Sequence, residues 1–203
     1  MSVVVKICGV RTADDARAAA DAGADLIGLN FVPTSPRRVD LADAAAIARA
    51  VPDLPRVGVF VDVPRAEVAR IAAEVGLAGL QFHGDEAPDD CAGWPQFTIK
   101  ALRVRPGEDP AARAARYQTT YVLLDAHVEG LAGGTGVALD ARAAAGVASA
   151  RLFMAGGLRP DTVADVVRLL RPHGVDVASG VERTPGVKDH GKIQEFVRRA
   201  KAA

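Results

Sequence analysis

The chain opens with Val3-Val4-Val5-Lys6-Ile7-Cys8-Gly9, a short apolar run that ends in a thiol and a glycine. A second run far along the chain, Val122-Leu123-Leu124-Asp125, ends in a carboxylic acid. Short runs of this kind, rich in β-branched residues, indicate buried strands. If both runs are parallel strands of one barrel, their carboxyl ends face the same cavity. The thiol would then be placed to accept a proton and the carboxyl group to donate one.

Eight such runs alternate with alanine-rich amphipathic segments along the chain. The expected strands are Val3–Ile7, Asp25–Asn30, Arg56–Val61, Gly79–Phe82, Phe97–Lys100, Tyr121–Leu124, Arg151–Met154 and Val175–Ala178. The expected helices are Thr12–Ala22, Leu41–Val51, Pro64–Val75, Glu86–Ala92, Pro110–Tyr117, Leu139–Val147, Pro160–Leu170 and Lys192–Ala202. Their starts carry recognisable signals, because Thr12 and Asp40 are good N-caps and Pro64 and Pro160 suit a first helical turn.

Eight strand–helix alternations in 203 residues predict an α/β protein with a (β/α)8 architecture, the TIM barrel, in one domain over residues 1–203. The alternative is a doubly wound open sheet, which usually has about five to seven strands and a glycine-rich dinucleotide turn after the first. Gly9 follows the first strand here, but no G-x-G-x-x-G pattern does. The pattern therefore favours the barrel.

The charge balance argues against several classes of partner. The sequence has 25 basic and 25 acidic residues, so it lacks the basic excess that nucleic acids or anionic membranes attract. No apolar stretch is long enough to span a bilayer, and no signal-peptide pattern follows Met1, so we expect a cytoplasmic protein. Cys8 and Cys91 form neither a disulfide framework nor a metal-spaced pair.

Several polar residues fall on the strand faces that we expect to point into the barrel. Side chains alternate along a strand, and the apolar face should meet the helices. The opposite face then carries Lys6, Cys8, Gln81, His83, Lys100, Asp125 and Asp176. Charges are costly to bury, so these residues indicate an active site at the carboxyl ends of the strands. The alternative is a self-satisfied ionic network in the core, with His83 a hydrogen-bonded core histidine and Gln81 a packing residue.

Three glycine clusters follow the late strands. They are Gly133-Gly134-Thr135-Gly136, Gly156-Gly157 and Ser179-Gly180-Val181-Glu182. Barrel enzymes often bind phosphate through backbone N–H groups in the loops after strands seven and eight, so the clusters together favour a phosphate site over simple turns. The loop after the second strand carries Arg37, whose guanidinium is suited to pairing with a carboxylate, although a solvated surface arginine fits the sequence equally well.

Taken in order, these motifs resemble a known family. The matching pieces are Lys6 to Gly9, Phe31 to Arg37, Gly58 to Val61, Gln81 to Gly84, Leu123 to Asp125, Gly133 to Gly136, Ala155 to Leu158, Asp176 to Glu182 and Pro185 to Asp189. Together they resemble phosphoribosylanthranilate isomerase of tryptophan biosynthesis. The chain departs from the family's usual residues at Thr34 and Ala178, both beside binding positions.

The resemblance implies an Amadori rearrangement that needs neither cofactor nor metal. The expected reaction converts N-(5-phosphoribosyl)anthranilate into 1-(2-carboxyphenylamino)-1-deoxyribulose 5-phosphate. Asp125 would be the general acid, Cys8 the general base and Arg37 the partner of the anthranilate carboxylate. The remaining residues expected to bind the substrate are His83, Asp176, Gly134, Gly156, Gly157, Ser179 and Gly180.

Physical chemistry adds a requirement for each catalytic role. Lys6 lies on the same strand face as Cys8. A nearby ammonium group favours the thiolate form, which Cys8 needs in order to act as a base. Asp125 must be kept protonated at neutral pH, by burial or by a neighbouring negative charge.

Two other functions remain compatible with the motifs. One is another phosphosugar isomerase or epimerase on the same barrel. A metal-dependent epimerase needs histidine and aspartate ligands from several strands. The chain has four histidines, and only His83 ends an inward-facing strand; the others are His127, His173 and His190. The other is a non-catalytic barrel that binds a phosphorylated ligand, since a buried cysteine often serves as a small hydrophobe. The barrel would work as a monomer or a homodimer.

Overall fold

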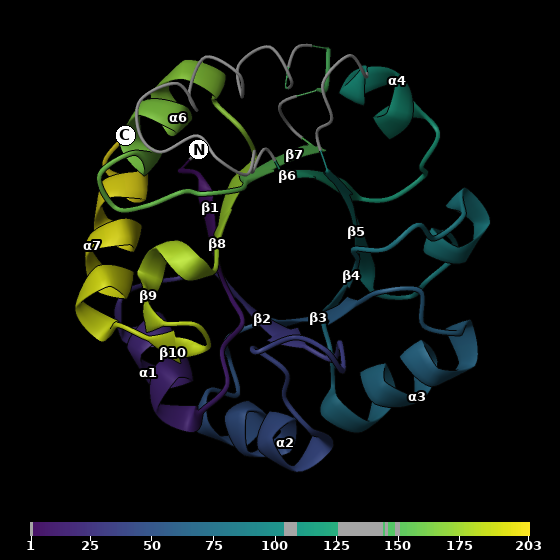
Figure 1. Ribbon diagram of the computed structural model, residues 1–203, viewed down its shortest axis with the longest axis horizontal. Helices are drawn as coiled ribbons and strands as arrows, with labels where there is room; N and C mark the ends of the chain where they lie inside the picture. The colour runs from purple at the N-terminus through teal and green to yellow at the C-terminus, as the bar shows by residue number, and fades with distance from the viewer. Residues whose placement is uncertain (1, 104–108, 126–143, 145, 149–150) are drawn as a thin grey trace.

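A computed structural model describes residues 2–103, 109–125, 144, 146–148 and 151–203. Its centre is a closed barrel of eight parallel strands in sequential order, which Figure 1 shows as a ring. The strands are β1 (Val4–Cys8), β2 (Leu26–Asn30), β3 (Arg56–Phe60), β4 (Gly79–Phe82), β5 (Phe97–Arg103), β6 (Tyr121–Asp125), β7 (Leu152–Ala155) and β8 (Gly174–Val177). The barrel prediction is confirmed, and the open-sheet alternative is wrong because β1 pairs with both β2 and β8.

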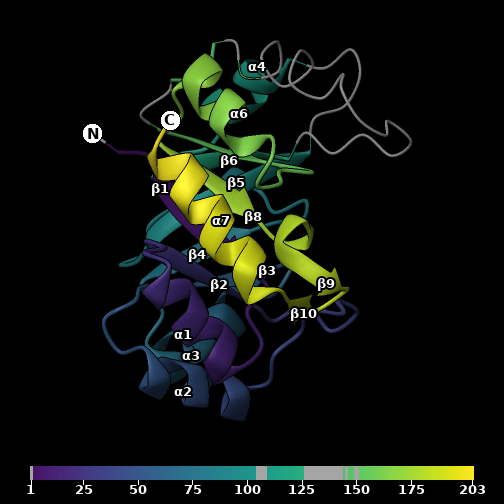
Figure 2. The same cartoon turned by 90° about the vertical axis from the view of Figure 1, so that its left-hand side faces the viewer.

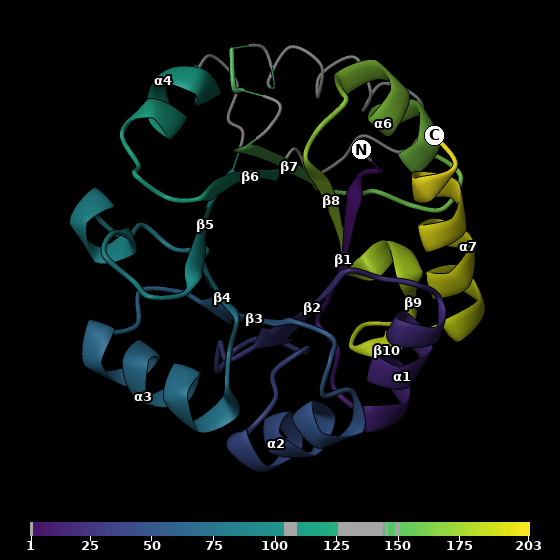
Figure 3. The same ribbon diagram turned by 180° about the vertical axis from the view of Figure 1, so that it is seen from behind.

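Helices surround the ring, as Figures 1 and 3 show from its two ends. They are α1 (Ala13–Asp21), α2 (Leu41–Ala50), α3 (Arg65–Val75), α4 (Pro110–Ala115), α6 (Val163–Leu170) and α7 (His190–Lys201). The N-caps predicted for the first two are confirmed: Thr12 Oγ1 accepts from the Asp15 amide at 3.1 Å, and Asp40 Oδ1 accepts from the Asp43 amide at 2.8 Å. None of the helices within the described parts of the chain has the length and apolar character that a bilayer crossing requires.

Some predicted helix limits were wrong. Pro64 is the N-cap of α3 rather than part of its first turn, and α6 begins at Val163, three residues after Pro160. The segment expected as a helix over Glu86–Ala92 forms only a 3-10 turn, η1 (Pro88–Cys91). Most of the expected helix Leu139–Val147 lies outside the described residues.

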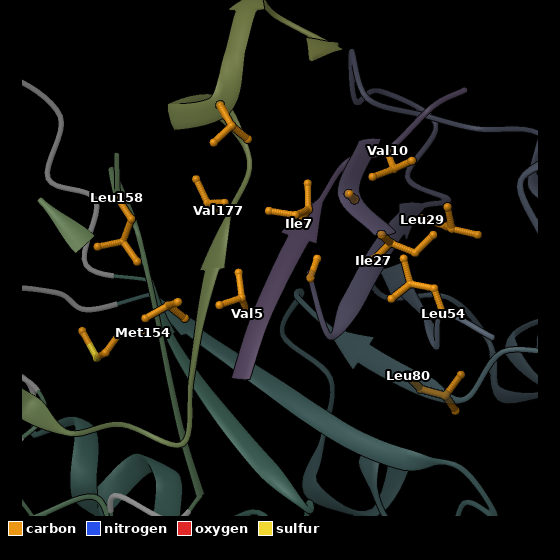
Figure 4. Packing of buried hydrophobic residues seen from close by; sticks show 14 of the residues in the cluster. Val5, Ile7, Val10, Ile27, Leu29, Leu54, Leu80, Met154, Leu158 and Val177 are labelled. Carbon is orange, nitrogen blue, oxygen red and sulfur yellow. The ribbon is translucent and has the colours of Figure 1, made fainter. Parts of the chain in front are cut away.

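The barrel wall separates two apolar regions. The outer region packs strand side chains such as Val5, Ile7 and Leu80 against the helices, and Figure 4 shows several of them. The inner region contains Leu26, Val57, Ile99, Ala101, Leu123, Phe153 and Ala155. An aromatic cluster fills the amino-terminal end of the barrel, where Tyr121 stacks on His173 with ring centres 4.5 Å apart. The open end is therefore the carboxyl end of the strands.

The predicted strand faces hold for β1, β4, β6 and β8 but not for β5. Ile99 and Ala101 lie in the inner region, so Lys100 points outward towards the surrounding segments. Its ammonium group lies 2.6 Å from Glu86 Oε2 and 2.7 Å from the Gly84 carbonyl oxygen. The rule that the apolar face meets the helices failed here because a buried ion pair satisfies a lysine on the helix-facing side.

A feature that the sequence did not predict follows β8. The 3-10 turn η3 (Ser179–Val181) leads into a two-stranded antiparallel hairpin of β9 (Glu182–Thr184) and β10 (Val187–Lys188). Figure 2 shows the hairpin on the side of the barrel away from the N-terminus. Lys188 Nζ donates to the Ala178 carbonyl oxygen at 2.9 Å, which ties the hairpin to the end of β8.

Candidate active site

A cavity of about 270 Å³ opens at the carboxyl ends of the strands. The predicted site residues within the described part of the chain all line it: Cys8, Arg37, His83, Asp125, Gly156, Gly157, Asp176, Ser179 and Gly180. Gly134 lies outside the described residues. Asn30, Val59 and Gln81 line the cavity as well. Parallel closure of the barrel therefore brings together residues that lie up to 172 positions apart, from Cys8 to Gly180.

Cys8 ends β1 and is almost buried. Burial raises the pKa of its thiol above the ordinary value, while the ammonium groups of Lys6 and Lys188 act in the opposite direction. Lys6 was expected to favour the thiolate; its effect has that direction but burial outweighs it. The thiol form therefore prevails at neutral pH, and the two cations stabilise the thiolate when it forms.

Lys6 is held inside the barrel by Asp176. The two residues are register partners on β1 and β8, and Lys6 Nζ lies 2.8 Å from Asp176 Oδ1. Burial acts to lower the pKa of Lys6, but Asp176 and Cys8 outweigh it and the pKa is raised. Lys6 therefore remains an ammonium ion beside Cys8.

Gly28 makes room for these groups, and sequence reasoning missed it. It is the register partner of Cys8 on β2, where a Cβ atom would lie 2.8 Å from Cys8 Sγ and 3.1 Å from Lys6 Nζ. Any side chain at this position would displace the thiol. A glycine inside a strand pattern is the signal that would have identified such a close approach.

Asp125 ends β6 and faces His83, which follows β4. His83 Nε2 lies 3.6 Å from Asp125 Oδ2, a charge-pair separation longer than a hydrogen bond. Gln81 Nε2 lies 3.1 Å from His83 Nδ1. The Gln81 carbonyl oxygen, Oε1, is buried and has no hydrogen-bond partner among the described residues. Gln81 thus contacts His83, in addition to packing within the barrel.

Arg37 reaches the cavity from the segment after β2, and its guanidinium pairs with Glu182. Arg37 Nε and Nη2 donate to the two Glu182 oxygens at 2.8 and 2.7 Å. Burial acts to raise the pKa of Glu182, but Arg37 and Lys188 outweigh it and the pKa is lowered. Glu182 is therefore a carboxylate fixed between two cations. From the sequence, Glu182 was predicted only as part of a phosphate-loop motif, and its pair with Arg37 was not predicted.

The loops after β7 and β8 form another part of the cavity lining. Gly156, Gly157 and Ser179 line the cavity there. At Gly180 a Cβ atom would collide with the Leu158 carbonyl oxygen, so the two loops pack backbone against backbone. The glycines of both loops line the cavity without side chains, so an anion can approach their backbone closely, which suits the predicted phosphate site.

The cavity therefore combines a thiol, a carboxyl group, a guanidinium and glycine-rich loops. A thiolate and a carboxylic acid can remove and donate protons at different atoms of one substrate. The guanidinium and the loops can hold two anionic groups at separate places. This set suits the acid–base isomerisation of a phosphorylated sugar that also carries a carboxylate.

Comparison with known proteins gives consistent results. Residues 5–199 match the family described as N-(5'phosphoribosyl)anthranilate (PRA) isomerase. The chain is 48% identical over 205 residues to the N-(5'-phosphoribosyl)anthranilate isomerase of Thiobacillus denitrificans, and the match covers 100% of both chains.

Solved structures agree with the sequence relatives. The phosphoribosyl anthranilate isomerase of Thermotoga maritima superposes with a TM-score of 0.87 at 33% identity, over 99% of this chain and 100% of that one. A phosphoribosyl anthranilate isomerase in complex with reduced 1-(o-carboxyphenylamino)-1-deoxyribulose 5-phosphate superposes with a TM-score of 0.85 at 33% identity, over 99% of this chain and 100% of that one. From its sequence and its fold alike, this chain belongs to the N-(5'-phosphoribosyl)anthranilate isomerase family.

Proposed function

We propose that this protein converts N-(5'-phosphoribosyl)anthranilate into 1-(2-carboxyphenylamino)-1-deoxyribulose 5-phosphate, an aldose–ketose isomerisation in tryptophan biosynthesis. The observation that carries the proposal is the shared cavity of Cys8, Asp125 and Arg37 in a chain of this family. The reduced product analogue bound by a structural relative contains the phosphate and the carboxylate that such a cavity must hold.

The proposed reaction begins at Asp125. Its carboxylic acid donates a proton to the furanose ring oxygen while the bond from that oxygen to C1′ breaks, so the ring opens to a protonated imine. The donated proton remains on the new 4′ hydroxyl group. The carboxylate that results faces His83 across 3.6 Å, where a ring N–H of His83 can stabilise the developing negative charge.

Cys8 acts in the second step. Its thiolate removes the proton at C2′ of the imine, and the electron pair moves into the C1′–C2′ bond to give an enolamine. Water then supplies a proton to C1′ and accepts the 2′ hydroxyl proton, which gives the ketone. Transfer of a proton from the Cys8 thiol to the Asp125 carboxylate through solvent restores both groups. Lys6 and Lys188 favour the thiolate electrostatically, which offsets part of the cost of ionising a buried thiol.

The other residues of the cavity hold the substrate. Arg37 pairs with the anthranilate carboxylate, and the loops containing Gly156, Gly157, Ser179 and Gly180 hold the phosphate. His83 and Asp176, which both line the cavity, contact the sugar. Gly134 belongs to the same proposed phosphate site, although it lies outside the described residues.

A fluorescence assay tests the proposal. Phosphoribosylanthranilate is generated from anthranilate and phosphoribosyl pyrophosphate by a transferase, and the loss of its fluorescence is followed after this protein is added with a chelator. We expect rapid loss with the wild type and almost none with Cys8→Ser or Asp125→Asn, since a hydroxyl is a far weaker base and an amide supplies no acidic proton.

Two results would contradict parts of the proposal. Wild-type turnover by Cys8→Ser would remove Cys8 from the general-base role. No turnover by well-folded wild type would leave the two alternatives, another phosphosugar isomerase or epimerase and a non-catalytic barrel, and a screen of phosphosugars for turnover or binding would separate them. We also propose that the protein is cytoplasmic. It is a monomer or a homodimer, and sedimentation of the purified chain would distinguish these two states.

A further inference from the structure

The strongest polar contact of Arg37 is not with a solvent-facing group but with Glu182, 145 residues further along the chain. The guanidinium offers its Nε and one Nη2 hydrogen to the two oxygens of Glu182, at 2.8 and 2.7 Å, in a fork-to-fork geometry. The Glu182 side chain is nearly buried, whereas that of Arg37 is 23% exposed. Glu182 is therefore the fixed partner, and Arg37 the one that reaches towards the cavity.

This contact determines which edge of the guanidinium remains available. Arginine has five N–H groups in one plane, and Glu182 uses the edge formed by Nε and Nη2. The edge formed by Nη1 and the second Nη2 hydrogen remains, and no described residue accepts a hydrogen bond from Nη1. That edge has the spacing to bind a second carboxylate with two parallel hydrogen bonds.

Charge provides the second part of the argument. Lys188 Nζ lies 3.0 Å from Glu182 Oε1 and is buried. Burial lowers the pKa of Lys188, and Glu182 acts against that shift. With Lys188 as an ammonium ion, Arg37, Glu182 and Lys188 together carry a net charge of one positive unit. Without Lys188, Glu182 would cancel the charge of Arg37 and repel another carboxylate. With Lys188, the cluster lacks one negative charge, which a ligand with one carboxylate supplies.

The same cluster connects the two ends of the cavity. Glu182 directly follows η3, and Lys188 Nζ also donates to the Ala178 carbonyl oxygen before that turn. The position of Arg37 is thereby tied to the loop that contains Ser179 and Gly180. A carboxylate bound to Arg37 and an anion bound at that loop would be held at a separation that Glu182 sets.

From these contacts we infer that Glu182 is a positioning residue, which presents one edge of Arg37 to the substrate and thereby selects phosphosugars that carry an arylamine carboxylate. The inference rests on the proposed function, in which Arg37 binds that carboxylate. Glu182 itself needs no contact with the substrate, because it acts through Arg37. The competing explanation is that the pair only anchors the hairpin of β9 and β10.

The test compares two ligands that differ in one group. Reduced 1-(2-carboxyphenylamino)-1-deoxyribulose 5-phosphate and its counterpart without the carboxylate, the reduced phenylamino compound, are titrated calorimetrically into the full-length protein. The variant Glu182→Asp keeps the charge but shortens the side chain by one methylene, so it cannot hold both Arg37 nitrogens. We expect roughly tenfold weaker binding of the carboxylate ligand and a change of less than about twofold for the other.

Glu195→Asp is a matched control. Glu195 also pairs with an arginine through two oxygens, at 2.9 and 2.8 Å to Arg198, but both side chains are exposed on α7 and neither lines the cavity. We expect it to bind both ligands as the wild type does. Equal weakening of both ligands by Glu182→Asp would show an anchoring role alone and overturn the inference.

The variant Arg37→Ala separates failure of the inference from failure of the proposed function. If it leaves the preference for the carboxylate ligand intact, Arg37 does not bind the carboxylate and the proposed role fails. If it abolishes the preference while Glu182→Asp preserves it, Arg37 binds the carboxylate without help and only the inference fails. We expect both variants to reduce the preference, and the double variant to lose no more than Arg37→Ala alone.

Should Glu182→Asp not fold, Glu182→Gln provides the same comparison. Its amide nitrogen faces an Arg37 donor, so the two-bond contact is lost with the side-chain length kept. The added net positive charge beside Arg37 acts to strengthen carboxylate binding, so a weakening in this variant reports the lost two-bond contact. We again expect selective weakening of the carboxylate ligand, and an unchanged preference would overturn the inference.

Discussion

Gln81 and His83 are joined by a hydrogen bond of 3.1 Å between the Gln81 amide nitrogen and His83 Nδ1. An amide nitrogen can only donate, so Nδ1 accepts and the proton of the neutral ring is on Nε2. Nε2 is the atom that faces Asp125. Gln81 therefore orients an N–H group of His83 towards the proposed general acid, from a strand position that is fully inside the barrel.

This relationship predicts the tautomer of His83. Nitrogen-15 NMR of the imidazole rings should show the Nε2–H form for His83 in the wild type, whereas Gln81→Glu should favour a proton on Nδ1, because a carboxylate accepts where the amide donated. We expect kcat to fall at least about tenfold in Gln81→Glu with little change in KM, since the affected group acts on the reaction rather than on binding. An Nδ1–H tautomer in the wild type would contradict the prediction.

The surroundings of Cys8 predict how its reactivity depends on pH. Burial raises the pKa of the thiol and Lys6 lowers it, by more than Asp176 raises it. In the variant Lys6→Met/Asp176→Asn, which leaves no buried unpaired charge, the pKa of Cys8 should rise further. The rate of alkylation by iodoacetamide should therefore increase with pH, with a midpoint above that of an ordinary cysteine. In the double variant the midpoint should lie at a still higher pH.

The second thiol must be removed for that measurement. Burial raises the pKa of Cys91 to about 12, and Cys91→Ala leaves Cys8 as the one cysteine of the chain. Turnover at neutral pH should fall together with the fraction of thiolate. An unchanged or more acidic midpoint in the double variant would exclude Lys6 as the group that favours the thiolate.

The ion pair of Lys100 and Glu86 predicts a large effect on stability. Glu86 accepts from Lys100 Nζ at 2.6 Å and also from the amides of Asp62 and Gly84, all at a nearly buried carboxylate. Lys100→Met alone would leave that charge without its cation, and we expect it to lower the free energy of unfolding by about 3–5 kcal/mol. Lys100→Met/Glu86→Gln should recover much of the loss in urea denaturation. A double variant as unstable as the single one would show that packing, not charge, dominates.

Gly28 predicts a steric effect on catalysis. In Gly28→Ala, the new methyl group would meet Cys8 Sγ and Lys6 Nζ at about van der Waals overlap, so the thiol must shift or the strands must separate. We expect a loss of about 1–3 kcal/mol in the free energy of unfolding and a clear fall in kcat/KM. Gly191→Ala on α7, where the nearest atom to the new carbon is 3.4 Å away, is the control and should retain activity. Full activity in Gly28→Ala would show that the pocket around Cys8 has spare room.

The local features of this chain were readable from its sequence. The strand runs, the caps at Thr12 and Asp40, and the placement of Cys8 and Asp125 at strand ends depend on residues close together in the chain. Periodicity and capping act over a few residues, so they identify strands, helices and the inward face of β1. The eight-fold alternation then determined the barrel, because few architectures accommodate it.

Contacts between distant segments depended on the tertiary structure. The outward face of Lys100, the pair of Arg37 with Glu182, and the room that Gly28 leaves for Cys8 all arise where strands or loops far apart in sequence meet. A side chain's partner sets whether its charge can be buried, and no local pattern encodes a partner 145 residues away. The sequence by itself determined the barrel and the chemical groups at its open end, whereas only the folded chain decided which of those groups hold one another in place, since that depends on distances across the closed barrel.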